Sequence, residues 1–303
     1  MPEPFPPRLT GRPFTRSEST AFGLTARQLD ARRVLRLHHG VRLVPVAGDP
    51  TALQRTASAL KVLPADTLVT GVTGLRLFGV EVGPEVPVSF CSTHPYPVRR
   101  PGIVVSRTTQ LPPHTGRLAA PADCFAAAAT ELGLVDAVAA GDWLLHLRLA
   151  TLADLAAAVD RRSRRNVRRA RRALALVRTG VESPRESKLR LVLVLAGLPE
   201  PRPNVTLRSA DGLIGRADLL YEAYRLVIEY DGLQHLSDRA QWESDIQRVE
   251  RFTDAGHHVI RVTAARMANP RRLVLDVHRT LVARGYSGAA PTFTPEWMTC
   301  FAR

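Results

Sequence analysis

The stretch 183–284 alternates helical and strand-like patterns, which predicts an α/β domain in this part of the chain. The letters SPRE at 183–186 supply the N-cap, the first-turn proline and the third-position glutamate of a helix start. Three apolar segments separated by turns then indicate successive antiparallel strands, namely NVTLRS, LIGRADLLY and RLVIEYDG. A helix at about 240–255, the strand HHVIRVT and a last helix at about 269–284 complete the order α-β-β-β-α-β-α.

Chain length sets the expected number of domains. A chain of 303 residues is too long for one typical domain and suits two. We expect an α/β (α+β) fold class, in which a winged helix and a small α/β segment precede the C-terminal domain. The expected divisions are a disordered leader at 1–13, a winged helix-turn-helix at 14–48, a mixed α/β middle domain at 49–159, an arginine-rich linker helix at 160–182, the C-terminal domain at 183–284 and a tail at 285–303.

Three carboxylates fall on two of the C-terminal strands. If the hairpin turn is centred between Ala223 and Tyr224, Asp218 and Glu229 lie directly opposite each other, with Cβ atoms about 5 Å apart. Asp231, two residues further on, shares the face of Glu229. Like charges opposed on a sheet are destabilising unless a proton or a cation compensates them. Because carboxylate oxygens are hard ligands, we expect the three to bind Mg²⁺ or Mn²⁺.

The strand that carries Glu229 is expected to be central in its sheet. Leu226, Ile228 and Tyr230 would point away from Glu229 and into a core. An acid on a buried strand costs free energy unless it is compensated, which favours a bound metal. His235, in the polar loop that follows, could carry a proton or bind the metal, because its unperturbed pKa is about 6.5.

Three neighbouring residues have two interpretations each. Glu186 could cap its helix through Ser183, or it could complete the metal site as an acid beside the sheet. Asp245 and Arg248, three residues apart on the helix at about 240–255, would either face the site or pair with each other.

From Phe14 onward the sequence is typical of a helix-turn-helix followed by a wing. A helix in TRSESTAF, a tight turn at Gly23, a second helix in LTARQLDARRVLRL and a β segment in HHGVRLVPV are expected. Thr25 is the expected N-cap of the second helix. Four arginines along or just after that helix would contact DNA, unless they are merely solvated: Arg27, Arg32, Arg33 and Arg36.

The stretch 160–178, DRRSRRNVRRARRALALVR, holds nine arginines and one acidic residue. Helical spacing would place four of them along one face, where they could contact phosphates in a row: Arg161, Arg165, Arg168 and Arg172. The alternative is a solvated linker helix between two domains.

Charge and composition narrow the partners and the compartment. The formal net charge of +14 and the sequence pI of about 11.0 favour nucleic acid over an anionic membrane. The sequence has no apolar run of about 18 residues and no apolar signal segment, so we expect a cytoplasmic protein without a membrane span. Cys91, Cys124 and Cys300 lack C-x-x-C spacing, which argues against a zinc site or a disulfide framework.

The C-terminal segments also carry a family resemblance. GRADLLY, VIEYDGLQH, WESDIQR and GHHVIRVT appear in order across nearly all of 183–283. They resemble the very-short-patch-repair-endonuclease-like domain of the PD-(D/E)xK nuclease superfamily, which implies a restriction-endonuclease-like fold. By this resemblance, Asp218 matches the family aspartate, and Glu229 and Asp231 match the acidic end of the strand. His235 matches the histidine that follows.

One departure from the family pattern affects the expected chemistry. Many PD-(D/E)xK nucleases have lysine where this sequence has Asp231. Proton removal from the attacking water would then fall to His235 or to metal-bound hydroxide. The expected function is a Mg²⁺- or Mn²⁺-dependent DNA endonuclease, which hydrolyses phosphodiester bonds. The alternative is a DNA-binding transcriptional regulator or antitoxin-like protein whose nuclease fold no longer cuts.

A second resemblance concerns residues 14–150. The segments HHGVRLVP and TGVTGLRLFG are similar to those of AbiEi-type antitoxins, where a winged helix precedes a small α/β domain. This resemblance implies DNA binding and autoregulation. DNA is therefore the expected partner, with no membrane, while a homodimer and a toxin or other protein partner stay open.

Overall fold

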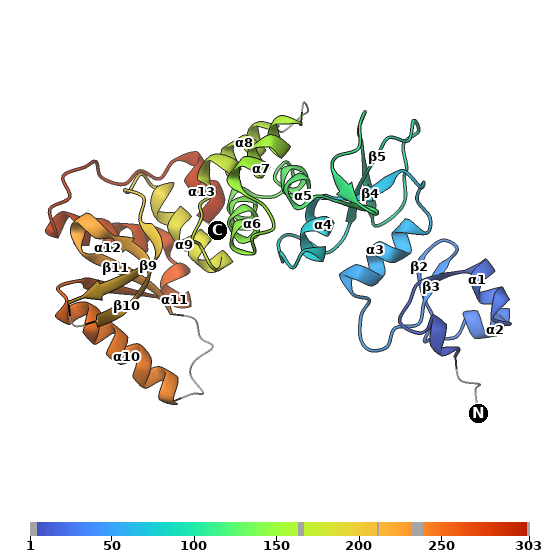
Figure 1. The fold of residues 1–303 in the computed structure, drawn as a ribbon, viewed down its shortest axis with the longest axis horizontal. Helices are drawn as coiled ribbons and strands as arrows, with labels where there is room; N and C mark the ends of the chain where they lie inside the picture. Colours follow the sequence, from blue (N-terminus) through green and yellow to red (C-terminus); the bar gives the residue numbers. More distant parts are fainter. Residues whose placement is uncertain (1–4, 163–166, 211, 232–238, 302–303) are drawn as a thin grey trace. The chain divides into compact units, whose positions relative to one another are not determined.

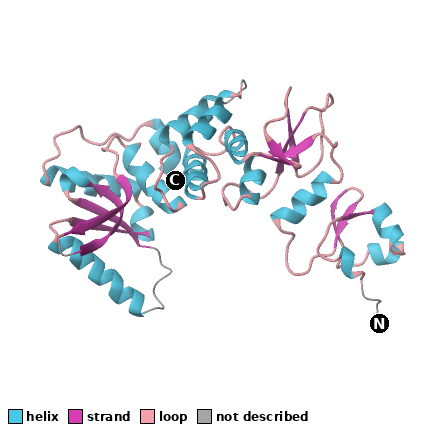
Figure 2. Cartoon of the chain, viewed as in Figure 1, coloured by secondary structure: helices cyan, strands magenta, loops and turns pink. Residues whose placement is uncertain are grey.

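The computed structural model describes residues 5–162, 167–210, 212–231 and 239–301, with the backbone alone at 239–246. It divides into two compact units (Figure 1). The first unit takes 1–132 and 149–171, and the second takes 133–148 and 172–303. The described residues form helices and three sheets, which confirms the mixed α and β class (Figure 2).

The N-terminal part of the first unit is a small sheet with short helices. Its three strands pair in the order β1-β3-β2. The elements are β1 (Phe14–Thr15), α1 (Arg16–Ala21), α2 (Ala26–Leu29), β2 (Leu35–His38) and β3 (Val41–Leu43). Thr25 caps α2 as expected, because its hydroxyl accepts the backbone N–H of Gln28 at 3.3 Å.

The second helix of this part is much shorter than the sequence indicated. It ends at Leu29 instead of continuing through the arginines that follow. Leu35–His38 instead forms a strand that pairs with β3, with Leu35 and Leu37 half-buried and Arg36 exposed. This period of two fits a strand, so the alternation outweighs the helical propensity of the same residues.

The proline-rich leader is also more ordered than expected. Pro7–Leu9 forms one 3-10 turn, and Phe5 and Leu9 are buried. Both pack with Phe14 and Val44 in the core of the N-terminal part. Apolar burial therefore holds 5–13 against the sheet, although prolines suppress regular structure there.

The rest of the first unit surrounds a five-stranded sheet of order β6-β5-β4-β8-β7. It has the mixed α/β character expected for the middle of the chain. Its elements are α3 (Ala52–Leu60), β4 (Thr67–Val69), α4 (Gly71–Leu77), β5 (Val88–Ser92), β6 (Ile103–Arg107), β7 (His114–Thr115), β8 (Leu118–Ala119), α5 (Pro121–Ala128) and α7 (Leu152–Asp160). The last of the three points at which the chain passes between the units falls within α8 (Val167–Leu176).

The second unit has a four-stranded sheet of order β12-β11-β10-β9, with β11 inside it as expected. Its elements are α6 (Leu134–His146), α9 (Pro184–Val194), β9 (Arg202–Ser209), β10 (Gly212–Tyr221), β11 (Leu226–Asp231), α10 (Arg239–Asp254), β12 (His258–Thr263), α11 (Ala264–Met267), α12 (Pro270–Ala283) and α13 (Pro295–Phe301). Apart from α6, the short α11 and α13 in the tail, this is the expected order α-β-β-β-α-β-α. Helix α10 lies on one face of the sheet, and α9 and α12 lie on the other (Figure 1).

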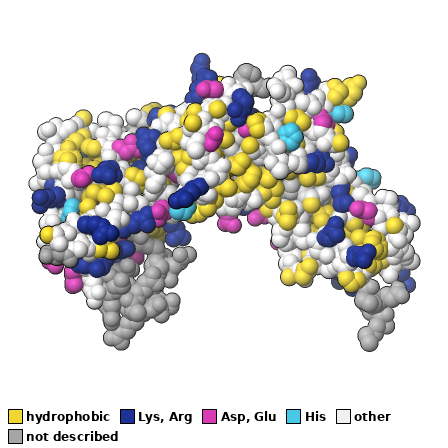
Figure 3. All heavy atoms as spheres, in the orientation of Figure 1, with side chains coloured by type: hydrophobic (Ala, Val, Ile, Leu, Met, Phe, Trp, Pro, Cys, Tyr) yellow, Lys and Arg dark blue, Asp and Glu magenta, His cyan; other side chains and the backbone are white. Residues whose placement is uncertain are grey.

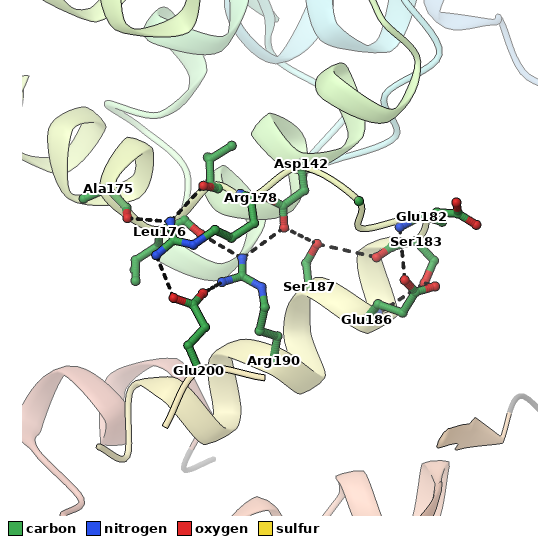
Figure 4. A network of polar contacts seen from close by, with 12 residues as sticks. Asp142, Ala175, Leu176, Arg178, Glu182, Ser183, Glu186, Ser187, Arg190 and Glu200 are labelled. Atoms are coloured by element: carbon green, nitrogen blue, oxygen red, sulfur yellow. Dashed lines mark hydrogen bonds and ion pairs between the residues drawn. The ribbon is translucent and has the colours of Figure 1, made fainter. Parts of the chain in front are cut away.

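A buried ion pair holds α6 in the second unit (Figure 4). Arg190 of α9 and Asp142 of α6 are 0% and 1% exposed. Arg190 donates to Asp142 at 3.2 Å, to the Leu176 carbonyl at 2.7 Å and to Glu200 at 2.8 Å. Ser187, one turn before Arg190, donates to Asp142 at 2.7 Å. The network fixes α6 against α9, although the two segments are far apart in the sequence.

Asp142→Ala is expected to lower the free energy of unfolding of the second unit by about 3 kcal/mol, because Arg190 would stay buried without one of its carboxylates. All three tryptophans, Trp143, Trp242 and Trp297, belong to this unit. Urea unfolding followed by tryptophan fluorescence therefore reports on it alone. The exposed Asp136→Ala, on the same helix, should cost less than about 1 kcal/mol. Equal losses in the two variants would contradict the role of the buried pair.

Candidate functional site

The β10–β11 hairpin brings Asp218 and Glu229 side by side. The strands pair Leu219 with Ile228, and the same register continues to Asp218 and Glu229, as the expected turn at 223–224 requires. The backbone N–H of Asp218 donates to Glu229 Oε1 at 3.3 Å, and the N–H of Tyr230 donates to Asp218 Oδ2 at 2.7 Å. Each carboxylate is therefore held by the backbone of the other strand.

Glu229 is buried deeply for an acid. Its side chain is 4% exposed, and the flanking Val227 and Ile228 are completely buried. Arg248 of α10 places Nη2 2.8 Å from Glu229 Oε2. An ionised carboxylate in this position needs a nearby cation, because desolvation of the charge is costly. Arg248 supplies that cation and therefore faces the site. The Asp245 side chain lies outside the described residues, so its expected pairing with Arg248 stays a prediction.

Burial raises the pKa of Asp218 to about 6. The Tyr230 N–H acts against this rise because it stabilises the ionised form. The nearby charge of Glu186 raises the pKa further, while Arg248 and Arg216 lower it. The Asp218 carboxyl therefore lies among charges from three elements, α9, β10 and α10, and titrates close to neutral pH.

Glu186 caps the first turn of α9 and also borders the site. Its Oε1 accepts the Ser183 hydroxyl at 2.8 Å, and its Oε2 accepts the backbone N–H of Glu182 at 3.0 Å. Ser183 Oγ in turn accepts the Glu186 N–H, as expected for an N-cap. Asn204 of β9 donates to the same carboxylate. Because β9 pairs Val205 with Ala217 and Pro203 with Leu219, Asn204 lies opposite Asp218.

Asp231 differs from the other two carboxylates of the expected metal site. It is half-buried, and Arg261 of β12 donates to its Oδ2 at 2.7 Å. Within the described ranges, no group of three His, Cys, Asp or Glu residues is arranged to hold a metal ion. Asp218 and Glu229 are thus linked through the hairpin backbone, whereas Asp231 pairs with Arg261. His235 lies outside the described residues. Arg261 gave no signal in the sequence, because it reaches Asp231 only through the parallel pairing of β11 and β12.

The arginines near the N-terminus do not form the expected row on one helix. Of the four, only Arg27 lies on α2, because that helix ends at Leu29. Arg36 lies on β2, and Arg32 and Arg33 lie in the turns between. All four are exposed, and the Arg33 guanidinium lies 5.6 Å from the centre of the Phe5 ring.

The arginine stretch at 160–178 is likewise not one continuous stripe. Helix α7 ends at Asp160 and α8 begins at Val167; Arg165 lies between them, outside the described residues. Arg161 pairs with Asp123 at 2.9 Å, and Arg172 pairs with Glu296 at 2.7 Å. Arg168 is exposed on α8. Two of the four arginines expected to contact phosphates are thus already paired with carboxylates. On the face drawn in Figure 3, basic side chains are dispersed among acidic and apolar ones.

Among the helices that the structure describes, none is both long enough and apolar enough to cross a bilayer.

Two curated proteins of Mycobacterium tuberculosis, from different strains and both named as uncharacterized proteins, are similar to this chain. Each is 26% identical over 275 residues, which cover 85% of this chain and 97% of the relative. The likeness therefore extends over most of both chains. No family model matches the sequence, and no solved structure matches it.

The raised pKa of Asp218 predicts a pH-dependent stability. The unfolded carboxyl has a pKa of about 3.9, so between about pH 4 and 6 the folded state binds more protons than the unfolded state. The free energy of unfolding should fall as the pH rises through this window. Asp218→Asn keeps an oxygen for the Tyr230 N–H, removes this dependence and should stabilise the second unit by about 2 kcal/mol at pH 7–8.

Urea unfolding at pH 4.5, 5.5, 7 and 8 tests this expectation. Asp254→Asn, at the exposed end of α10, is the matched control and should leave the pH dependence of the wild type unchanged. An Asp218→Asn variant that is less stable than the wild type at pH 8 would show that the carboxylate is not strained by its burial.

Proposed function

We propose that this protein is a metal-dependent endonuclease that hydrolyses phosphodiester bonds in DNA. The observation that carries the proposal is the pair of carboxylates, Asp218 and Glu229, held side by side on two central strands. Burial of two such groups destabilises the fold unless a cation or a proton compensates them. Proteins retain such a cost where the groups do chemistry.

The two carboxylates fit a divalent metal by their donor chemistry. Both offer hard oxygen donors, which suit Mg²⁺ or Mn²⁺, and the pKa of about 6 at Asp218 leaves it ionised at neutral pH. Asp218 and Glu229 would hold the ion, and Asp231 would join them where it separates from Arg261. The metal would polarise a phosphoryl oxygen and lower the pKa of a bound water. His235 is the proposed proton carrier.

Arginines around the carboxylates support a phosphate-bearing substrate. They come from four elements, α9, β10, α10 and β12: Arg185, Arg216, Arg248 and Arg261. Three of them pair with carboxylates of the site or its border. Arg185 differs, because its guanidinium lies 5.8 Å from the centre of the Tyr230 ring and its side chain is exposed. We assign to it a contact with the phosphate backbone, which guanidinium groups bind well.

A second candidate is a DNA-binding regulator that has this fold without cleavage. The ion pairs of Glu229 with Arg248 and of Asp231 with Arg261 favour it, because both acids are already compensated by internal cations. This candidate predicts DNA binding that weakens steeply with salt and occurs equally well in EDTA.

Incubation of the full-length protein with supercoiled plasmid in Mn²⁺, Mg²⁺ or EDTA tests the proposal. Cleavage should require the metal. Asp218→Ala and Glu229→Ala should each lower the cleavage rate by more than about 100-fold, beyond the usual loss when only an outer partner of a metal site is removed.

Glu222→Ala is the matched control, because Glu222 is an exposed acid at the turn of the same hairpin. It should cut as the wild type does. Binding of the plasmid without cleavage in any metal would favour the regulator. Cleavage that survives in EDTA, or in Asp218→Ala, would refute the assignment of the site.

A further inference from the structure

The cation beside Glu229 belongs to the protein itself. Glu229 Oε2 lies 2.8 Å from the Arg248 guanidinium, while Oε1 accepts the Asp218 N–H. Both oxygens of this buried carboxylate are thus in contact with polar groups of the chain. A divalent ion that used Glu229 as a ligand would meet the positive charge of Arg248 at the same carboxylate.

The fold makes space for Arg248 in this position. Gly215 of β10 lies under α10, and a Cβ added there would come within 3.2 Å of Arg248 Cγ and 2.9 Å of Phe252 Cζ. Only a residue without a side chain allows the helix to approach this closely. The close approach lets the stem of Arg248 pack on β10 while its charged end reaches Glu229 on β11. Arg248 is therefore placed by tertiary packing, unlike a freely mobile surface side chain.

The exposure of Arg248 differs from that of its partner. The arginine side chain is 37% exposed, whereas Glu229 is 4% exposed. The carboxylate is consequently fixed within the sheet, whereas part of the Arg248 side chain is open to solvent. If one member of the pair moves when a second cation arrives, it is the arginine.

We propose that Arg248 is the resident counter-cation of Glu229 and that it competes with the divalent metal for this carboxylate. This inference rests on the proposed metal site. In the metal-free protein, Arg248 neutralises Glu229 and stabilises the fold. Metal binding requires the Arg248 guanidinium to turn away from Glu229. The apparent metal affinity is therefore the intrinsic affinity multiplied by the fraction of molecules in which the ion pair is open.

Calorimetric titration of the full-length protein with Mn²⁺ tests the competition without any cleavage assay. Arg248→Met keeps the apolar stem and removes the charge, so it should bind Mn²⁺ about tenfold more tightly than the wild type or better. In EDTA the same variant should melt at a lower temperature, because Glu229 loses its counter-charge. Saturating Mn²⁺ should then raise its melting temperature by more than it raises that of the wild type.

Arg251→Met is the matched control. Arg251 is exposed on the same helix, three residues further along, so its removal changes the net charge equally without touching Glu229. Its Mn²⁺ affinity should equal that of the wild type within about twofold. Arg248→Lys, which keeps the charge but loses the planar guanidinium, should bind Mn²⁺ with intermediate affinity and serves if Arg248→Met does not fold.

Two failures are distinguishable. Mn²⁺ affinity in Arg248→Met and Arg248→Lys that equals or falls below that of Arg251→Met would overturn the competition and leave the metal site standing. Absence of Mn²⁺ binding in the wild type and in every Arg248 variant would overturn the metal site, and the competition with it.

Discussion

The contact between Asp218 and Glu229 is the constraint around which the second unit is arranged. Each carboxylate accepts a backbone N–H from the opposite strand, so neither can turn away without leaving that donor unpaired. The pair must then be balanced electrostatically inside a sheet with helices on both faces. Arg248 compensates Glu229, and the remaining strain is expressed as a raised pKa at Asp218. Apolar side chains at these buried positions would stabilise the fold without any charge to compensate.

The border of this site is fixed by a second, more deeply buried set of charges. The Glu186 carboxylate sits on the first turn of α9, and Ser187, the next residue, donates to Asp142. Asp142 and Arg190 tie that helix to α6. The contacts with α6 therefore support α9, the helix that carries Glu186 beside Asp218. Preorganised sites depend on such supporting contacts.

The local sequence pattern was sufficient to predict the β10–β11 hairpin. It was insufficient to predict which side chains from other elements contact that hairpin. The register of Asp218 and Glu229 follows from the turn and from alternation along two strands, both visible in one short stretch of sequence. Arg248 reaches Glu229 only because Gly215 lets α10 approach, which no spacing reveals. Asp142, one of two acids in an otherwise largely apolar helix, gave no signal. The helix expected after Thr25 was too long. The residues around Arg36 fit both a helical pattern and the alternating pattern of a strand, and their pairing with β3 makes them a strand.

Each of the two units is built from two separate segments of the chain. The chain passes from one unit to the other after residues 132, 148 and 171. A recombination event in the arginine-rich stretch, or an expression fragment that begins there, would separate α6 from α9. Arg190 would then be left without its partner Asp142. The two units therefore cannot be exchanged by a single crossover. A fragment meant to contain the second unit must include residues 133–148.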